Sequence, residues 1–308
     1  MIFLVRSIIV AGALVSLAFL ATACTVAPAA SPAVSSRTGT GAAAPPRPLS
    51  TVAKPAPKPA PKPKPAMPHV TISRVRTADG VLVTVAAFRG PVRYVLHNGS
   101  SDPGYAAAAA GVKAGPAVGG AERGQLLAAF NGGFKLGVGA GGYEQEGHVI
   151  SPLLRGYASL VIDRSGRARI ALWGYGAPGP GEAVYSVRQN LGLLVSAGKP
   201  ASTANSWWDW GATIGGAEYV ARSAIGETAR GSLVFVGSMS AVPADLAYAL
   251  IKAGARIGME LDINPNWVQL DVATRPGGTL RAELPGQWRP ADQFVVGWDR
   301  DFFTVLAG

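Results

Sequence analysis

The pattern of apolar positions in residues 69–308 predicts a series of short β-strands. Two runs rich in β-branched residues, 70–77 and 81–88, flank Ala78-Asp79-Gly80, which is typical of a hairpin turn. A second pair, 158–163 and 168–173, flanks Arg164-Ser165-Gly166 in the same way. Other short apolar runs predict further strands at 92–97, 126–130, 190–196, 217–225, 232–236 and 256–263.

Helical spacing is confined to a few segments. Leu246, Ala249 and Leu250 recur at helical intervals between Ser240, a candidate N-cap, and Gly254, a candidate left-handed C-terminal residue. The small-residue stretch 106–124 favours a short helix. Many strands with few helices predict a single α+β domain over 69–308, with mixed or antiparallel sheets and enough chain to bury a core.

The first 68 residues have a different pattern. Arg6 precedes an apolar run at 7–20, which is too short for a spanning helix but fits a signal peptide over 1–23. Ala21-Thr22-Ala23 resembles a cleavage site, and the chain's single cysteine, Cys24, follows as in a bacterial lipobox. We therefore expect lipidation of Cys24 at the cell envelope, with free secretion as the alternative.

Residues 24–68 are rich in proline, alanine and lysine, and half of the chain's 24 prolines fall in residues 1–68. Alternating proline over 53–68 predicts a disordered, extended linker that reaches about 50 Å at roughly 3.1 Å per residue. This linker would act as a stalk. Its lysines could also contact anionic envelope polymers, but spacing and solubility are the favoured explanation.

The charge distribution changes the meaning of the net charge of +10. Seven basic residues and no acidic residue fall in 1–68, so the remaining 240 residues carry 21 basic and 18 acidic groups. The predicted domain is therefore close to neutral and has no basic patch with interleaved aromatic residues. We expect no nucleic-acid partner.

The segment 258–264, Gly-Met-Glu-Leu-Asp-Ile-Asn, is the most informative for chemistry. Strand alternation predicts Glu260, Asp262 and Asn264 on one face, opposite the apolar residues. Two carboxylates about 6.6 Å apart along a strand can shift one another's pKa, as acid–base catalysis requires. The alternative is an amphipathic strand with a solvated polar face. Trp267 follows in the next loop.

A second candidate is the turn Asn131-Gly132-Gly133-Phe134, followed by Lys135. Two glycines permit positive φ, and their N–H groups can hold an anion; an ordinary tight turn is the alternative. The G-x-G-x-x-G match at 137–142 is not followed by a helical pattern, so we interpret it as a flexible loop. His148 lies just beyond this loop and is either structural or part of the site.

Two further features are weaker. Arg222, in Arg222-Ser223-Ala224-Ile225-Gly226, can offer its planar fork to a phosphate or lie on the surface. The cluster Trp207-Trp208-Asp209-Trp210 can stack on sugar rings or pack against the core.

Taken in order, several of these motifs resemble one family. They are the Asn131–Phe134 turn, the segment 147–150 with Gly156, the motif 222–226, and the helix followed by Leu261-Asp262. This resemblance, over about 70–300, is to the phosphodiester glycosidases, that is, N-acetylglucosamine-1-phosphodiester α-N-acetylglucosaminidase-like domains. Where that family has a Gly-Gly-Gly-Ser loop, this chain has Ile263-Asn264-Pro265-Asn266, as in a divergent bacterial branch.

The resemblance implies an exported hydrolase acting on a sugar-1-phosphodiester or related envelope glycan, with a non-catalytic polysaccharide-binding module as the alternative. Asp262 would be the catalytic carboxylate, with Glu260 beside it and Arg222 on the phosphate. The expected substrate contacts are Asn131, Gly132, Gly133, Lys135, His148, Asn264 and Trp267. No cofactor motif is evident; Glu260, Asp262 and Asn264 offer oxygen ligands to a divalent cation, so metal dependence is left open.

Overall fold

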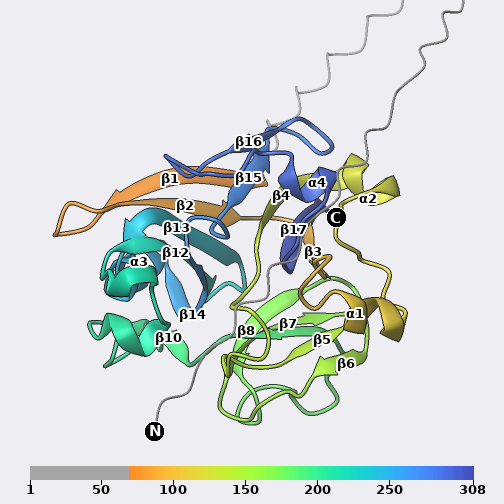
Figure 1. Ribbon diagram of the computed structural model, residues 1–308, viewed down its shortest axis with the longest axis horizontal. Coiled ribbons are helices and arrows are strands. Elements are labelled where there is room, and N and C mark those ends of the chain that lie inside the picture. Colours follow the sequence, from red (N-terminus) through yellow and green to blue (C-terminus); the bar gives the residue numbers. More distant parts are fainter. Residues whose placement is uncertain (1–68) are drawn as a thin grey trace, which may run out of the picture. The chain divides into compact units, whose positions relative to one another are not determined.

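A computed structural model describes residues 69–308, and the signal peptide, Cys24 and linker predicted from the sequence lie outside these residues. The described chain forms antiparallel sheets with four short α-helices, which confirms the predicted α+β class (Figure 1). No helix in this part of the chain is long and apolar enough to cross a membrane.

The first sheet contains both the predicted N-terminal hairpin and the strand that carries Glu260 and Asp262. Its seven strands lie in the order β1 (Val70–Arg76), β2 (Leu82–Phe88), β13 (Leu233–Ala241), β12 (Val220–Thr228), β14 (Ala255–Ile263), β10 (Leu193–Ser196) and β11 (Lys199–Pro200).

The other two sheets have five strands each. The second runs β16 (Leu280–Ala282), β15 (Leu270–Ala273), β4 (Leu126–Asn131), β17 (Phe302–Ala307) and β3 (Val92–His97). The third runs β6 (His148–Ser151), β5 (Tyr143–Gln145), β9 (Val184–Gln189), β7 (Ala158–Asp163) and β8 (Ala168–Leu172). The remaining elements are α1 (Tyr105–Ala110), α2 (Gly120–Gln125), α3 (Pro243–Lys252), α4 (Gln293–Val296) and the 3₁₀ turns η1 (Trp207–Trp210) and η2 (Ile214–Gly216).

One apolar core joins all three sheets. It includes Phe88 and Phe235 from the first sheet, Phe130 and Phe303 from the second, and Leu160 from the third. The opposite face of the first sheet is covered by α3 (Figure 1). Because both faces of the central strands are covered, these strands read as continuous apolar runs instead of alternating ones.

Helix α3 approaches the first sheet at a pair of glycines. Gly226 and Gly258 are register partners on β12 and β14, and a Cβ on either one would lie 2.8 Å from a methyl group of Leu250. The glycine that closes the 222–226 motif is therefore needed for helix–sheet packing. Gly254, predicted to end the helix, has φ of 91° as expected.

The structure corrects several sequence-based boundaries. Helix α3 begins at Pro243, because the N–H of Val242 is held by the Asp245 carboxylate at 3.0 Å, and Ser240 belongs to β13. The stretch 106–124 contains parts of two short helices, α1 and α2, instead of one. Residues 137–142 contain no helix or strand, and the hairpin β5–β6 follows them directly, turning through Glu146 and Gly147 with φ of 54° and 82°.

Asp271, on β15, is a buried acid that links stability to pH. Burial raises its pKa to about 8 although Gln287 and Gln269 donate hydrogen bonds to it. Between pH 3.8 and about 8, the Asp271 carboxyl group is therefore protonated in the folded chain, whereas in the unfolded chain it has the ordinary pKa of 3.8 and is ionised. The resulting stabilisation is complete below the unfolded pKa and is lost as pH rises through about 8.

We expect Asp271→Asn, which mimics the neutral acid, to reduce the loss of stability with rising pH. Asp271 should contribute a slope on the order of 1 kcal/mol per pH unit in the window between its two pKa values. Urea unfolding from pH 4 to pH 9 measures this slope. The exposed Asp79→Asn variant is the matched control, and equal slopes in the wild type and both variants would contradict the assignment.

Candidate active site

The turn after β4 is shaped by close packing against its backbone. Neither Gly132 nor Gly133 has positive φ, contrary to the conformation suggested by the sequence. Instead, a Cβ on Gly132 would lie 1.9 Å from Oδ2 of Asp301, and a Cβ on Gly133 would lie 2.9 Å from Cζ of Arg188. Glycine is required at both positions because an ion pair occupies the space of a side chain.

That ion pair joins Arg188 on β9 to Asp301 just before β17. The Nε of Arg188 lies 2.7 Å from Oδ2 of Asp301, and both side chains are buried. Asp301 also accepts two hydrogen bonds from the turn. The N–H of Gly132 donates to its backbone carbonyl at 2.9 Å, and the N–H of Gly133 donates to Oδ2 at 3.3 Å. The turn's N–H groups therefore have acceptors within the protein, and the anion site suggested by the sequence is not formed there.

Asn131 and Asn190 connect this turn to the first sheet. The amide of Asn131 donates to Oγ of Ser223 at 2.9 Å and accepts from the N–H of Gln269 at 3.1 Å. Asn190, which sequence reasoning missed, accepts from the N–H of Phe134 and donates to two carbonyls of β14. Both amides thus position the ends of strands, and neither is free to contact a substrate.

A β-bulge interrupts the predicted alternation along β14. Ala224 pairs with Glu260, but Arg222 pairs with Ile263, so β14 has one more residue than β12 between these pairs. Met259 and Leu261 enter the central core, whereas Ile263 packs with Phe134. Glu260 and Asp262 consequently have separate partners, and neither carboxylate is among the charges that shift the other's pKa.

Glu260 pairs with Arg222 in the interior. Oε1 of Glu260 lies 2.7 Å from NH1 of Arg222, which also donates to the carbonyl of Trp210 at 3.0 Å. Both side chains are fully buried. Burial raises the pKa of Glu260 to about 7, while the positive charge of Arg222 opposes that rise. Arg222 is therefore enclosed beside its own counter-ion, unlike the accessible phosphate-binding arginine expected from the sequence.

Asp262 has a different arginine neighbour, Arg300, which the sequence reasoning did not identify. Oδ2 of Asp262 lies 3.5 Å from NH2 of Arg300, and Oδ1 accepts from the N–H of Ile263 at 2.7 Å. Burial raises the pKa of Asp262 well above its usual range, although Arg300 opposes this. Arg300 also donates to the carbonyl of Gly133 and lies 3.2 Å from Asp102.

The two acid–arginine pairs, Glu260–Arg222 and Asp262–Arg300, form the Asp262 cluster. Within it, only Asp262 and Arg300 keep some exposed surface. Their exposed fractions are 4% and 8%, compared with 0% for both Glu260 and Arg222. The guanidinium carbon of Arg300 lies 5.2 Å from the ring centre of Trp267, which is half-buried. The small exposed area of the cluster therefore lies at Asp262 and Arg300, next to Trp267.

Other predicted site residues lie at the rim or elsewhere. Lys135 is exposed directly after the turn, and Asn264, with φ of 105°, is half-buried in the loop after β14. A cavity of about 80 Å³ lies between this loop and Val220. His148 is exposed on β6, the outer strand of the third sheet, and takes no part in the hydrogen bonds of the cluster.

The members of the tryptophan cluster differ in burial. Trp210 is buried and donates from Nε1 to the carbonyl of Thr203, whereas Trp208 is 63% exposed.

The residues offered for a divalent cation do not converge in this fold. Glu260 binds Arg222, Asp262 faces Arg300, and Oδ1 of Asn264 accepts from the N–H of Asn266. Within residues 69–308, no group of three or more His, Cys, Asp or Glu side chains is placed to hold a metal ion.

Comparisons with solved structures find a weak likeness of fold at low sequence identity. The catalytic domain of zebrafish N-acetylglucosamine-1-phosphodiester α-N-acetylglucosaminidase aligns with a TM-score of 0.50 at 13% identity, covering 80% of this chain and 85% of that domain. A hypothetical protein from Synechocystis aligns with a TM-score of 0.46 at 14% identity, covering 78% and 62% of the two chains. No family model matches the chain, and no curated protein matches it.

The first of these alignments supports a weak likeness of fold to a phosphodiester glycosidase domain.

The packing of the turn predicts that Gly132→Ala is strongly destabilising. Its Cβ would overlap the carboxylate of Asp301, so the ion pair with Arg188 would have to move. We expect a loss of about 3 kcal/mol in the free energy of unfolding, measured by urea denaturation. Gly192→Ala is the control, since a Cβ there meets nothing within 4 Å. Equal stability of the two variants would contradict this account of the turn.

Proposed function

We propose that the chain is a hydrolase that cleaves a sugar-1-phosphodiester or a related envelope-glycan linkage at Asp262 and Arg300. The observation that supports this most is their pairing: a carboxyl group of raised pKa lies 3.5 Å from the Arg300 guanidinium, and Arg300 keeps 8% of its surface exposed. The fold likeness to a phosphodiester glycosidase domain agrees with this reaction class. We also propose that the chain is a divergent member of that family.

In this proposal Asp262 is the general acid. A carboxyl group whose pKa is raised by burial keeps its proton near neutral pH and can donate it to a departing oxygen. Cleavage breaks the bond between C1 of the sugar and the phosphate oxygen. The phosphate leaves as a monoester whose bridging oxygen takes up the proton from Asp262. Water adds to C1 and releases a proton to bulk solvent, and Asp262 regains a proton from solvent before the next turnover.

Arg300 replaces Arg222 as the residue that binds the phosphate. Its Nη2 donates to the carbonyl of Gly133, and its Nε lies near the carboxylate of Asp102. Its Nη1 makes none of the hydrogen bonds found within residues 69–308. A planar guanidinium with a free donor suits a phosphate oxygen and the charge that develops on it. Trp267, next to Arg300, offers a ring for the sugar.

The other predicted residues receive supporting roles. Glu260 and Arg222 hold the bulged part of β14 against β12, and Asn131 reaches the same place through Ser223. These residues position Asp262 without touching the substrate. Lys135 and Asn264 border the site and would contact the sugar or its aglycone. The 80 Å³ cavity is too small for a sugar, so the sugar would lie outside it.

The loop after β14 favours a second candidate, a polysaccharide-binding module without turnover. The N–H groups of Asn266, Trp267 and Val268 are all occupied by acceptors on Asn264. Unlike a glycine-rich loop, this one has no free N–H groups at these positions to cradle a phosphate. The exposed Trp208 is a surface on which a glycan could stack.

We further propose that the protein is exported and displayed at the cell envelope through a lipid on Cys24. The apolar run before Cys24 and the proline-rich segment after it support this location. A membrane surface and a glycan are then its partners, and no nucleic acid is required.

Turnover of a synthetic N-acetylglucosamine-1-phosphate methyl diester tests the enzyme proposal. Asp262→Asn should lower kcat at least about a hundredfold, because an amide cannot donate the catalytic proton. The control is Asp271→Asn, which also neutralises a buried acid but lies outside the cluster. Circular dichroism checks that each variant is folded.

Two results would contradict the proposal in different ways. Wild-type turnover by folded Asp262→Asn would show that the acid is misassigned. Glycan binding by the wild-type chain with no product would instead favour the binding module.

Membrane fractionation tests the anchor. We expect the wild-type chain to remain with the membrane and Cys24→Ser to be released, because the thioether-linked lipid needs the sulfur. Serine has similar size, so a change in distribution reports the lipid. Equal partitioning of both forms would indicate free secretion or another mode of attachment.

A further inference from the structure

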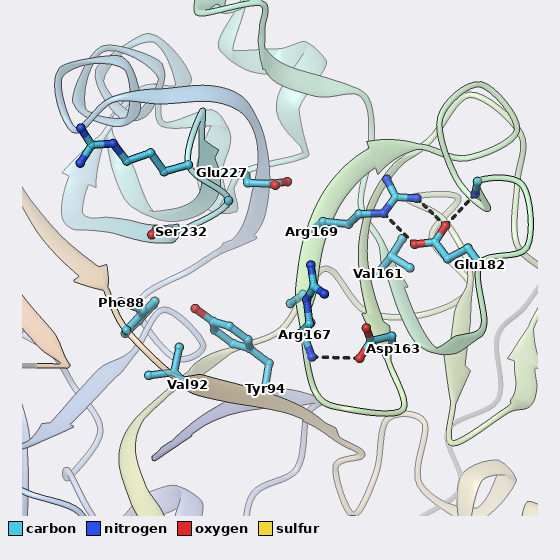
Figure 2. A pocket seen from close by; sticks show the side chains of 15 residues that line it. Phe88, Val92, Tyr94, Val161, Asp163, Arg167, Arg169, Glu182, Glu227 and Ser232 are labelled. Carbon is cyan, nitrogen blue, oxygen red and sulfur yellow. Dashed lines mark hydrogen bonds and ion pairs between the residues drawn. The ribbon is translucent and has the colours of Figure 1, made fainter. Parts of the chain in front are cut away.

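A large cleft in residues 69–308 is separate from the candidate active site. It has a volume of about 690 Å³, and none of the residues of the Asp262 cluster line it. It lies where β3, the β7–β8 hairpin and the β12–β13 turn meet, so each sheet contributes to its walls (Figure 2). Glu227 in this cleft and Arg222 in the cluster are five residues apart on β12, or about 17 Å along the strand.

Tyr94 points its hydroxyl group into this cleft (Figure 2). Its side chain is only 5% exposed, and its ring packs edge-on against Phe88 with centres 6.1 Å apart. Within the described part of the chain, no residue hydrogen-bonds the Tyr94 hydroxyl. A buried phenol usually has a hydrogen-bond partner, so this hydroxyl is available to a ligand.

Glu227 lines the opposite wall. Its Oε2 accepts from the N–H of Ile170 at 2.8 Å, which fixes the carboxyl group, while Oε1 has no hydrogen bond to a described residue. Burial and, to a smaller extent, the negative charge of Glu227 raise the pKa of the Tyr94 hydroxyl group. The cleft therefore has two oxygen-bearing groups in fixed positions, both suited to hydroxyl groups of a ligand.

The two arginines of β8 and its turn differ in their availability. Arg169 pairs with Glu182 through Nε at 2.7 Å and also donates to the carbonyl of Gly176 at 2.9 Å, so it holds the wall together. Arg167 is exposed, extends into the cleft (Figure 2), and has no carboxylate within 4 Å among the described residues. Arg167 is therefore a positive charge of this cleft that has no ion-pair partner among the described residues, although the Asp163 carboxylate accepts from its backbone N–H at 3.1 Å. Arg230, which also lines the cleft and is exposed, is a second arginine without such a partner among these residues.

We propose that this cleft binds an acidic saccharide, with its carboxylate or phosphate on Arg167 and its hydroxyl groups on Glu227 and Tyr94. The volume is within the range of about 300–1,000 Å³ typical of small-ligand sites. Polar and charged side chains dominate the lining, which suits a ligand rich in hydroxyl groups. The proposal does not depend on the reaction assigned to Asp262.

Calorimetric titration of the full chain tests it with four probes: glucuronate, glucose 6-phosphate, glucose and inorganic phosphate. At least one acidic sugar should bind more tightly than glucose and inorganic phosphate. Preference for glucuronate identifies a carboxylate ligand, and preference for glucose 6-phosphate identifies a phosphate ligand. Absence of binding by both acidic sugars, or equal binding of inorganic phosphate, would overturn the proposal.

Three variants locate the binding. Arg167→Ala should weaken the acidic sugar about tenfold or more, because the charge-assisted contact is lost. Tyr94→Phe keeps the ring and should weaken binding about two- to tenfold. Arg74→Ala, an exposed arginine on β1 outside the cleft, is the matched control and should leave affinity unchanged.

Arg300→Ala separates this proposal from the proposed reaction, because it should reduce turnover while leaving acidic-sugar binding intact. Loss of binding in Arg300→Ala with retention in Arg167→Ala would place the ligand in the candidate active site and overturn the proposal. If Arg74→Ala weakened acidic-sugar binding as much as Arg167→Ala, the binding would be explained by general electrostatic attraction, and the proposal would also be overturned.

Discussion

The buried ion pair between Arg188 and Asp301 is the constraint on which the rest of the site depends. It brings the third sheet to the second, and it occupies the space that side chains at Gly132 and Gly133 would need. Burying two charges is costly unless their hydrogen bonds are satisfied, and here the turn itself supplies the additional partners. The Asn131–Phe134 turn therefore packs its backbone directly against the ion pair, and the shape of the turn follows from that pair.

Two side-chain amides and one arginine connect this turn to β14. Asn190 and Asn131 tie the turn to the first sheet, and Arg300 reaches from Gly133 to Asp262. The same scaffold divides the acids by environment. Glu260 is enclosed with Arg222, whereas Asp262 lies beside an arginine that contacts solvent. This division, more than the spacing of the two acids in the sequence, makes Asp262 the candidate for proton transfer.

Local features of the fold could be predicted from the sequence, and features that depend on distant contacts could not. The hairpins at 70–88 and 158–173 were predictable because their turns are encoded by three residues between β-branched runs. The bulge in β14 was not, since the sequence there alternates perfectly and the extra residue is visible only against β12. Arg188, Arg300 and Asp301 belong to none of the motifs that the sequence reasoning singled out, so nothing in their neighbourhoods marked them as functional. Several short strands of the second and third sheets were missed because tertiary packing, not periodicity, determines them.

A crystal structure with a non-hydrolysable sugar-1-phosphonate tests the central claim most directly. The account predicts that a phosphonate oxygen lies within hydrogen-bond distance of the Arg300 guanidinium, with the bridging position next to Oδ2 of Asp262 and the sugar near Trp267. Phosphonate bound only at Arg167, with Asp262 and Arg300 unoccupied, would contradict it and would move the chemistry to the large cleft.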